Sequence, residues 1–359
     1  MPSRYAFTSL LLVTIGLLLV SRALGNRVLT NYAVKRLPLS VKAVRHVNPC
    51  PSERCVERFG VGGESRNILN SLQAGLPFGV YYDWFATADP PLDSRLEYWQ
   101  MIRTTAKGSS IPFDEIAAII KSRPGSVWII GNEPDNIWQD NIEAGEYASL
   151  YHEIYHFIKG RDPSAAIAIA AVSQPTPLRL EYLERVLDAY RESYGTPMPV
   201  DIWTIHGYIL REEVDSWGAG IPPGFDDVSG ELYEIEDHAD LEIFEENLLQ
   251  FRAWMDQQGY GERPLAVTEL GVLLPKDYGF SDEVVGNFMT EAYDFLSHSS
   301  GEYGWEQDDN RLFQWWFWYS LYDNYVFPTG DLFDSEQQVL TPLGEIMRDY
   351  IRGEQKIGG

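Results

Sequence analysis

Two glutamates, Glu133 and Glu269, each end an apolar run of the chain and could act together on one bond. Glu133 follows the apolar run 127–130 within Gly-Asn-Glu-Pro, and Glu269 follows the run 264–267 within Thr-Glu-Leu-Gly. Two carboxyl groups about 5–5.5 Å apart can hydrolyse a glycosidic bond with retention of configuration. One carboxyl group must then be protonated and the other ionised, which mutual repulsion and different neighbours can produce. The pair therefore predicts glycoside hydrolysis, provided that the fold brings the two side chains together.

The elements that would position them alternate along the chain. Short runs rich in β-branched and aromatic residues are separated by amphipathic stretches, as in repeated strand and helix units. The predicted strands are residues 58–62, 77–84, 97–103, 126–132, 165–173, 200–206, 264–269 and 311–320. The predicted helices include residues 112–122, 145–159, 178–192, 241–258 and 282–296. Each of these helices is long enough to cross over a sheet and return.

Eight strands with crossover helices predict an α/β fold, a (β/α)₈ TIM barrel in a single domain. No Gly-x-Gly-x-x-Gly turn opens the first unit, which disfavours a dinucleotide-binding domain. The predicted barrel covers residues 56–352, between an N-terminal extension at 26–55 and a C-terminal tail at 353–359. Because such barrels carry their chemistry at the carboxyl ends of the strands, both glutamates would lie at the same mouth.

The two glutamate motifs together resemble glycoside hydrolase clan A, the retaining (β/α)₈ glycosidases. Gly-Asn-Glu-Pro-Asp at 131–135 is also similar to the glycosyl hydrolase catalytic-core family that includes β-1,3-glucanases. The resemblance implies that Glu133 is the general acid and base, that Glu269 is the nucleophile, and that Asn132 binds the 2-hydroxyl of the sugar. The residues alone leave an alternative, in which each glutamate is a buried acid that caps a helix or pairs with an arginine.

Further residues follow from the same resemblance. His206 and Tyr208 are similar to the clan's His-x-Tyr motif, in which the imidazole contacts the sugar and the phenol donates to the nucleophile. Members of the clan also carry a tryptophan that stacks beneath the sugar near the end of the last strand, and Trp318 is our choice within the aromatic run 313–320. The alternative for each is a residue that only packs at the barrel rim or in the core.

Trp84 and Trp138 are further candidates for contacts with sugar, because aromatic faces bind the apolar faces of sugars without requiring charge. The sequence departs from the clan pattern at one position. Clan members often place an arginine beside the nucleophile at the end of the second strand, and none stands at 81–84. Arg58 or Arg103 are the candidates to replace it.

A competing motif lies in the predicted helix 145–159. His152, Glu153 and His156 match His-Glu-x-x-His, the zinc-binding motif of metalloproteases. This helix is an outer crossover of the predicted barrel, and no Gly-x-x-His follows to supply a third ligand. We therefore expect no metal and no organic cofactor. A non-catalytic carbohydrate-binding barrel is the other alternative to a glycosidase.

The N-terminal residues 1–25 have the layout of a secretory signal peptide, with Arg4, an apolar run and small residues before the expected cleavage site. The apolar run is shorter than the roughly 20 residues that a membrane span needs. An uncleaved membrane anchor is the alternative. Export to an oxidising compartment is compatible with a disulfide between Cys50 and Cys55, although two free thiols remain open.

The charge of the chain excludes one class of partner. Its 53 acidic residues exceed its 28 basic residues, giving a formal net charge of −25, which would repel nucleic acid. The excursion 209–240 has no clear periodicity and is predicted to be either a wall of the substrate groove or a solvated acidic loop. We expect a secreted retaining β-glycosidase with a carbohydrate substrate and no stable membrane partner. β-1,3-Glucan is one candidate, and mannan, xylan and galactan stay open, as does the oligomeric state.

Overall fold

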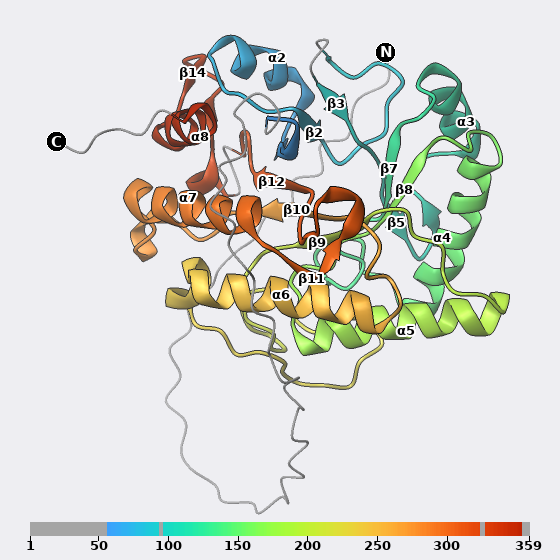
Figure 1. Ribbon diagram of the computed structural model, residues 1–359. Coiled ribbons are helices and arrows are strands. Elements are labelled where there is room, and N and C mark those ends of the chain that lie inside the picture. Colours follow the sequence, from blue (N-terminus) through green and yellow to red (C-terminus); the bar gives the residue numbers. More distant parts are fainter. Residues whose placement is uncertain (1–55, 93–95, 324–326, 354–359) are drawn as a thin grey trace, which may run out of the picture. The chain divides into compact units, whose positions relative to one another are not determined.

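A computed structural model describes residues 56–92, 96–323 and 327–353 (Figure 1). The predicted signal peptide, the N-terminal extension, Cys50 and Cys55 lie outside the described residues, as does all but the first residue of the predicted C-terminal tail. No helix within the described ranges combines the length and the apolar character that are needed to cross a membrane.

The central strands form two parallel sheets. A six-stranded sheet has the order β3, β2, β1, β12, β10, β9, and a three-stranded sheet has the order β4, β7, β8. The strands are β1 Phe59–Gly62, β2 Val80–Tyr82, β3 Glu97–Tyr98, β4 Gln100–Ile102, β7 Val127–Ile130, β8 Ala166–Ile169, β9 Trp203–His206, β10 Leu265–Leu270 and β12 Trp315–Tyr319. All of them lie in the eight runs predicted as strands, apart from the last residue of β10. The predicted α/β class with parallel strands is thus confirmed.

The two sheets are in contact at two places. Only Trp99 separates β3 from β4, and its backbone N–H donates to the Tyr81 carbonyl at 3.0 Å. At the other place, Ala168 of β8 and Ile202 form an isolated parallel bridge, and the Ile169 N–H donates to the Ile202 carbonyl at 3.2 Å. The predicted closed barrel would need these contacts to act as two further strand pairings.

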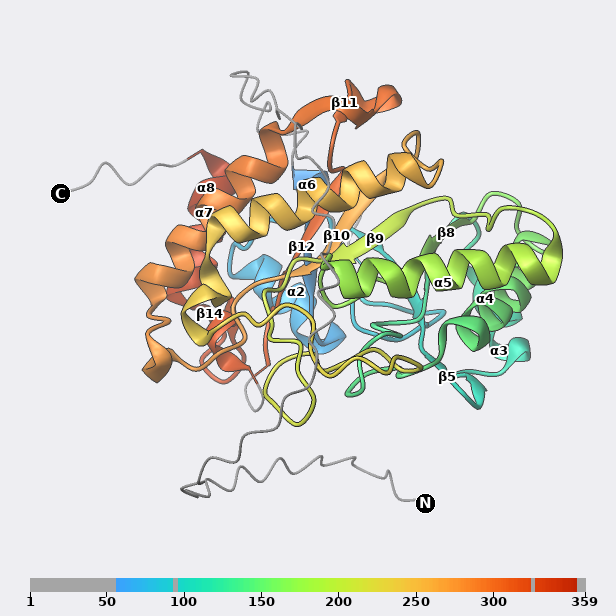
Figure 2. The ribbon, with the colours of Figure 1, turned by 90° about the horizontal axis from the view of Figure 1, so that it is seen from below.

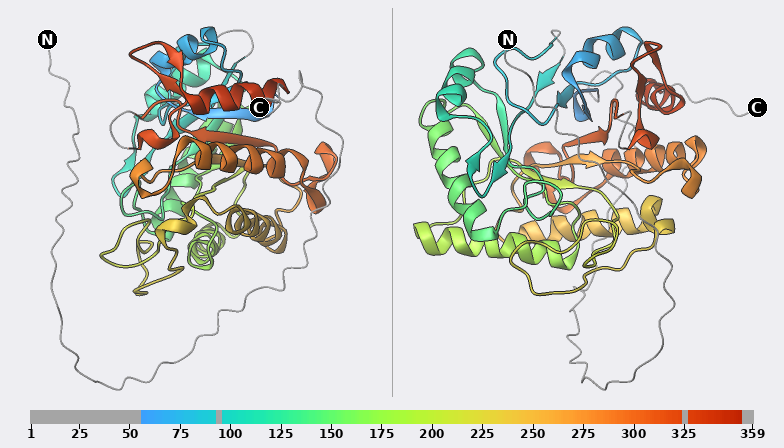
Figure 3. Two further views of the ribbon diagram at one scale, coloured as in Figure 1. Left: turned by 90° about the vertical axis from the view of Figure 1, so that its left-hand side faces the viewer. Right: turned by 180° about the vertical axis from the view of Figure 1, so that it is seen from behind.

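Helices cover the outside of the sheets (Figures 1 and 2). They are α2 Ser65–Gln73, α3 Phe113–Ser122, α4 Ala144–Lys159, α5 Pro177–Tyr194, α6 Leu241–Gln257, α7 Asp282–His298 and α8 Pro342–Arg352. Five of these helices match the predicted ones to within about two residues at each end, and α2 and α8 were not predicted. α4 packs against α5, and α7 packs against both α6 and α8 (Figure 3).

Several short elements complete the fold and were not predicted from the sequence. They are β5 Thr104–Thr105, β6 Gly108–Ser109, β11 Ser300–Trp305, β13 Phe333–Asp334 and β14 Val339–Leu340. The excursion between β9 and α6 contains a single 3-10 helix, Ile235–Ala239, and the residues of this excursion are all described. It therefore has the irregular structure that its lack of periodicity predicts.

The strand side chains alternate between two core layers, as the two-residue period of a strand requires. One layer contains Tyr82, Ile129 and Phe317, which belong to a cluster of strand residues that pack against one another. The other layer contains Trp316 and Trp318, which pack with residues of the helices. The two aromatic sets of β12 therefore face opposite sides of the sheet, and this alternation decides which aromatic residues pack against the helices.

Candidate active site

The carboxyl ends of β7, β9 and β10 bring three titratable side chains together. Glu133 follows β7, His206 is the last residue of β9, and Glu269 is the second-last residue of β10. One carboxylate oxygen or ring nitrogen from each of the three lies within 4.8 Å of those of the other two. All three side chains are almost fully buried. The two glutamates are thus close enough for the retaining arrangement, in which the carboxyl groups are about 5–5.5 Å apart.

Glu133 is held by one cationic and one neutral partner. His206 Nδ1 lies 2.8 Å from Glu133 Oε1, and Asn136 Nδ2 donates to Oε2 at 2.8 Å. Burial opposes ionisation, but the hydrogen bond and the charge of His206 outweigh it and hold the pKa of Glu133 below its usual value. Burial likewise acts against protonation of His206, but Glu269 and Glu133 raise its pKa. In the free site the shared proton therefore resides on the imidazole, although the sequence favoured a protonated glutamate.

Glu269 is held by three neutral donors. The Tyr82 hydroxyl and Trp84 Nε1 each donate to Oε1 at 2.9 Å, and the Tyr208 hydroxyl donates to Oε2 at 2.9 Å. His206 Nδ1 lies 3.5 Å from the same Oε2. Burial and the neighbouring Glu269 carboxylate raise the pKa of Tyr82 and of Tyr208 well above the usual value, so both phenols stay protonated donors. These contacts fix the orientation of a carboxylate that could attack a substrate.

Neither arginine suggested by the sequence contacts Glu269. Arg58 forms an ion pair with Asp308, with an N–O distance of 2.6 Å. Arg103 pairs with Asp140 on the loop after β7. Tyr82 and Trp84 occupy the place at the end of the second strand where an arginine was expected, so neutral donors replace the cation.

The backbone itself is unusual at two of these positions. Glu133 has a φ of 44° and Trp84 a φ of 62°, both in the left-handed region that non-glycine residues rarely adopt. Such conformations cost about 1–3 kcal/mol each and cluster at active sites, where the surrounding structure holds them. Their presence at Glu133 and at Trp84, which contacts Glu269, supports a functional role for this part of the protein.

The remaining sequence candidates lie in different places. Asn132 is buried next to Glu133, and its side-chain Oδ1 has no hydrogen-bond partner. Trp138 is 64% exposed on the loop that follows Glu133, and its N–H donates to Asn136 Oδ1 at 2.9 Å. Asn132 can therefore still accept a hydrogen bond from a ligand, and Trp138 is accessible to one.

Trp318 is not accessible, and its prediction as the stacking residue is corrected here. Its side chain is 0% exposed, and its Nε1 donates to the Gly330 carbonyl at 2.8 Å. Because side chains alternate along a strand, its neighbour Tyr319 faces the other side of the sheet and packs beside Tyr208. The Tyr319 ring also lies 5.7 Å from that of Trp84. The aromatic residue of β12 that reaches the site is thus one position further along the strand.

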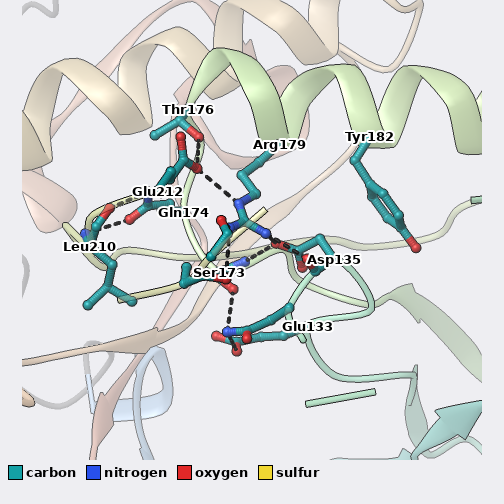
Figure 4. Close-up of polar contacts among 12 residues, drawn as sticks. Glu133, Asp135, Ser173, Gln174, Thr176, Arg179, Tyr182, Leu210 and Glu212 are labelled. Carbon is teal, nitrogen blue, oxygen red and sulfur yellow. Dashed lines mark hydrogen bonds and ion pairs between the residues drawn. The ribbon is translucent and has the colours of Figure 1, made fainter. Parts of the chain in front are cut away.

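A buried arginine that the sequence analysis missed stands behind Glu133 (Figure 4). Arg179 of α5 is 0% exposed and forms ion pairs with Asp135 at 2.8 Å and with Glu212 at 2.9 Å. It also donates to the carbonyls of Ala219 and Gly220, at 3.1 and 2.6 Å. One guanidinium thereby ties the loop after Glu133 to the excursion 209–240. Little in the sequence distinguishes this arginine from the exposed arginines of the same helix.

The same network explains Glu212, which the sequence placed in an acidic excursion without a specific role. Glu212 is fully buried, and its Oε1 also accepts from the Thr176 hydroxyl at 2.6 Å. Burial raises the pKa of Asp135 to about 6, against the lowering effect of Arg179. The excursion is therefore anchored by a desolvated charge network at this point rather than solvated.

The His-Glu-x-x-His motif lies on α4, outside the site. The rings of His152 and His156 are 4.3 Å apart, and His152 stacks on Tyr194 at 3.6 Å. Across the described ranges, the group of three or more potential metal ligands within mutual reach is that of Glu133, His206 and Glu269. The histidine pair belongs to no such group, so the motif has no third ligand close to it in the part of the chain that is described.

No family model matches the chain, and no curated protein matches its sequence. Solved structures resemble its fold. A GH128 (subgroup II) endo-β-1,3-glucanase from Sorangium cellulosum is 16% identical, with 82% of this chain and 98% of that one covered and a TM-score of 0.53. A GH128 (subgroup III) curdlan-specific exo-β-1,3-glucanase from Blastomyces gilchristii is 18% identical, with 81% and 97% covered and a TM-score of 0.55.

A third structure of similar fold is described differently. It is a GH128 (subgroup VII) oligosaccharide-binding protein from Cryptococcus neoformans, 15% identical, with 83% of this chain and 95% of that one covered and a TM-score of 0.54. At these identities the likeness establishes the fold alone. The fold is thus found both in glucanases and in a protein described as binding oligosaccharides.

The ion pair of Glu133 and His206 can be tested through the pKa of His206. We expect Glu133→Gln to lower the pKa of His206, because the amide removes the negative charge that favours the imidazolium and offers only a neutral oxygen as acceptor. Histidine ring resonances followed by NMR across the pH range measure this shift. His238 is the matched control, because burial lowers its pKa to about 4 and its ring bonds Ile209 and Leu273 instead. An unchanged His206 titration would contradict the ion pair.

Removal of the buried guanidinium tests the network behind Glu133. We expect Arg179→Met to lower the free energy of unfolding by about 3–5 kcal/mol, because Asp135 and Glu212 then stay buried without their cation. The loss should shrink as the pH falls from 7 to 5, because Asp135 then takes up a proton more readily in the folded than in the unfolded state. Denaturant unfolding at several pH values measures both effects.

Arg252→Met is the matched control for this experiment. Arg252 is equally buried, but it donates to the carbonyls of Arg263 and Gly261 and has no ion pair with a carboxylate among the described contacts. Its loss should destabilise the protein without the same pH dependence. Equal pH dependence in both variants would contradict the assignment of the effect to Asp135 and Glu212.

Proposed function

We propose that this protein is a retaining β-glycoside hydrolase that acts on β-1,3-glucan by double displacement. The observation that carries the proposal is the approach of Glu133 and Glu269 to within 4.8 Å, with different partners on each carboxyl group. Such a pair on the carboxyl ends of parallel strands has the geometry that a retaining mechanism needs. The positions match those that the clan A resemblance assigns to the two catalytic residues.

We also propose that the two sheets close into one eight-stranded barrel. The contact at Trp99 between β3 and β4 and the bridge between Ala168 and Ile202 support this closure. With β3 and β4 taken as one strand, these contacts would complete a ring of eight parallel strands. The active site would then lie at the mouth of the ring.

In the first step, Glu269 attacks the anomeric carbon and forms a covalent glycosyl ester while Glu133 protonates the departing oxygen. Tyr82, Trp84 and Tyr208 orient the attacking carboxylate. The proton reaches Glu133 along the 2.8 Å hydrogen bond from His206 Nδ1. His206 is thus the proton store of the resting site, which its raised pKa allows.

In the second step, the now ionised Glu133 takes a proton from water, and the water oxygen attacks the anomeric carbon and releases Glu269. The sugar leaves with its original configuration. Asn132, with its unpartnered Oδ1 beside Glu133, is the proposed contact to the 2-hydroxyl. No step requires a metal ion or an organic cofactor.

The choice of β-1,3-glucan rests on two observations. The net charge of −25 is compatible with a neutral polysaccharide and disfavours acidic ones. Structures of similar fold are described as β-1,3-glucanases, and two GH128 endo-β-1,3-glucanase structures from Amycolatopsis mediterranei hold laminarihexaose and laminaritriose. The substrate would be met outside the cell, because residues 1–25 are proposed to direct secretion.

Binding without hydrolysis is the second candidate function. It is favoured by the oligosaccharide-binding protein of similar fold from Cryptococcus neoformans. The two functions differ in one observable, since a binding protein would retain laminari-oligosaccharides without releasing reducing ends. Incubation of the purified chain with laminarin and a reducing-sugar assay therefore separates them.

The nucleophile is tested by Glu269→Ala. We expect loss of at least about 10³-fold in kcat on laminarin, because covalent catalysis has no other carboxylate at this position. Azide added to the variant should restore part of the rate on an activated aryl β-glucoside and yield the α-glucosyl azide. If Glu269→Ala hydrolysed laminarin at a rate close to that of the unaltered protein, Glu269 would not be the nucleophile.

The role of Glu133 as general acid is tested with two substrates whose leaving groups differ in their need for a proton. We expect Glu133→Gln to reduce kcat/KM strongly for laminari-oligosaccharides and much less for 2,4-dinitrophenyl β-glucoside, whose leaving group needs no proton. Asn136→Ala is the comparison variant, because it removes a hydrogen bond to Glu133 and leaves the carboxyl group in place. Equal losses of Glu133→Gln on both substrates would contradict acid catalysis by this residue.

A further inference from the structure

A buried carboxylate, that of Asp140, closes the loop that carries Asn132 and Glu133. The Asn132 N–H donates to Asp140 Oδ2 at 2.9 Å, and the Asp140 N–H donates to the Asn132 carbonyl at 3.4 Å. Asp140 is only 5% exposed. One side-chain and one backbone hydrogen bond therefore tie the two ends of the loop 132–140 together. None of the catalytic steps proposed above uses this carboxylate.

The same carboxylate joins the loop to the neighbouring strand. Asp140 Oδ2 also accepts from the Thr104 N–H at 2.7 Å and from the Thr104 hydroxyl at 2.8 Å, two residues beyond the end of β4. Asp140 Oδ1 accepts from Nε of Arg103, which the sequence suggested as a partner of the nucleophile. Three donors thus converge on one oxygen atom, Oδ2, and the arginine lies at the other.

The backbone next to Glu133 depends on such an anchor. The Gly131 N–H donates to the Ile102 carbonyl at 2.7 Å, and the Glu133 N–H donates to the Ala171 carbonyl at 3.0 Å. Asp140 Oδ2 supplies the acceptor for the N–H between these two. A buried backbone N–H needs a partner, and the left-handed φ of Glu133, 44°, persists only where the surrounding structure holds it.

Gly131 is the point about which this turn could rotate. Its φ is 93°, and a Cβ at this position would lie 2.9 Å from Thr104 Oγ1, so both the backbone conformation and the close packing require glycine. Glycine leaves the following peptide free to rotate, and that peptide carries the N–H that bonds to Asp140. Asp140 therefore restricts a rotation that would move the side chains of Asn132 and Glu133.

On the basis of the proposed function, we infer that Asp140 is a positioning residue, which acts through Asn132. Its Oδ2 fixes the peptide before Asn132 and thereby the side chain that is assigned above to the 2-hydroxyl of the attacked sugar. A misplacement of about 1 Å, caused by a substitution away from the chemistry, can cost about 100-fold in rate. Asp140 can therefore control the reaction without a contact to the substrate.

The inference concerns the position of one oxygen atom rather than the charge of the side chain. Asp140→Asn can place its amide oxygen where Oδ2 lies and direct its NH₂ group towards Arg103, whose side chain is 29% exposed and can turn to water. Asp140→Ala leaves the three donors at Oδ2 without an acceptor. Comparison of the two substitutions therefore separates the oxygen from the charge.

The test measures the contribution of the 2-hydroxyl to hydrolysis. The two substrates are p-nitrophenyl β-laminaribioside and its analogue that lacks the 2-hydroxyl of the sugar next to the aryl group. The kcat/KM of the first divided by that of the second reports the contact with Asn132. We expect Asp140→Ala to lower this ratio about ten-fold, because the displaced amide no longer meets the hydroxyl in the transition state. A role in stability alone would lower the Tm and leave the ratio unchanged.

Two further variants at the same position complete the test. Asp140→Asn should keep the ratio within about two-fold of that of the unaltered protein, because its amide oxygen replaces Oδ2. Asp140→Glu keeps the charge but moves the carboxylate by the length of one methylene group, so it should lower the ratio as Asp140→Ala does. Asp140→Glu therefore tests the inference even if Asp140→Ala does not fold.

Asp162→Ala is the matched control. Asp162 is 6% exposed and, like Asp140, accepts from two backbone N–H groups and one hydroxyl, those of Gly125 and Ser164. It lies between α4 and β8, at the amino end of β8, whereas Asp140 lies beyond the carboxyl end of β7. Its loss should lower the Tm and leave the ratio unchanged.

The outcomes separate this inference from the proposed function. If the unaltered protein hydrolyses p-nitrophenyl β-laminaribioside and the ratio is unchanged in Asp140→Ala and Asp140→Glu, or falls as far in Asp162→Ala, the positioning role is wrong and the glycosidase stands. A ratio that stays low in Asp140→Asn would overturn the assignment to the position of Oδ2. If the unaltered protein hydrolyses neither substrate, the function proposed above fails, and the positioning role fails with it.

Discussion

The hydrogen bond between Glu133 and His206 is the interaction on which the rest of the site depends. Two carboxylates buried this close together repel one another strongly, because water no longer screens their charges. His206 Nδ1 lies 2.8 Å from one carboxylate and 3.5 Å from the other, so a single imidazolium offsets both. The proton that catalysis would need is therefore the same proton that makes the close approach of the two carboxylates tolerable.

The neighbours of the two glutamates differ in kind, and this difference separates their roles. Glu133 is hydrogen-bonded to an imidazole that can give up its proton, whereas the donors to Glu269 are phenols and an indole that stay protonated. A residue that must give and take a proton needs the first environment. A residue that must attack needs fixed donors that hold it in one orientation.

The sequence predicted the strands well, because apolar runs of β-branched and aromatic residues are a local signal. From two short motifs at strand ends it also predicted that Glu133 and Glu269 lie close together, which the structure confirms. It did not predict Tyr82 as a ligand of Glu269, since the search there was for an arginine. It chose Trp318 instead of Tyr319, because a run of consecutive aromatic residues hides which positions face the helices. Arg179 and Glu212 meet only through the fold, and no local pattern marks either of them.

The position of Arg179 completes the argument about charge. Among the described residues no arginine contacts Glu269, and a fully buried arginine lies instead behind Glu133, where its charge helps to hold the pKa of Glu133 down. Its hydrogen bonds also join the loop after β7 to the excursion after β9, and these are the loops that follow Glu133 and His206. A shift of either loop would change the 2.8 Å bond between these side chains. The guanidinium of Arg179 therefore influences both the pKa of Glu133 and the position of the two loops that carry Glu133 and follow His206.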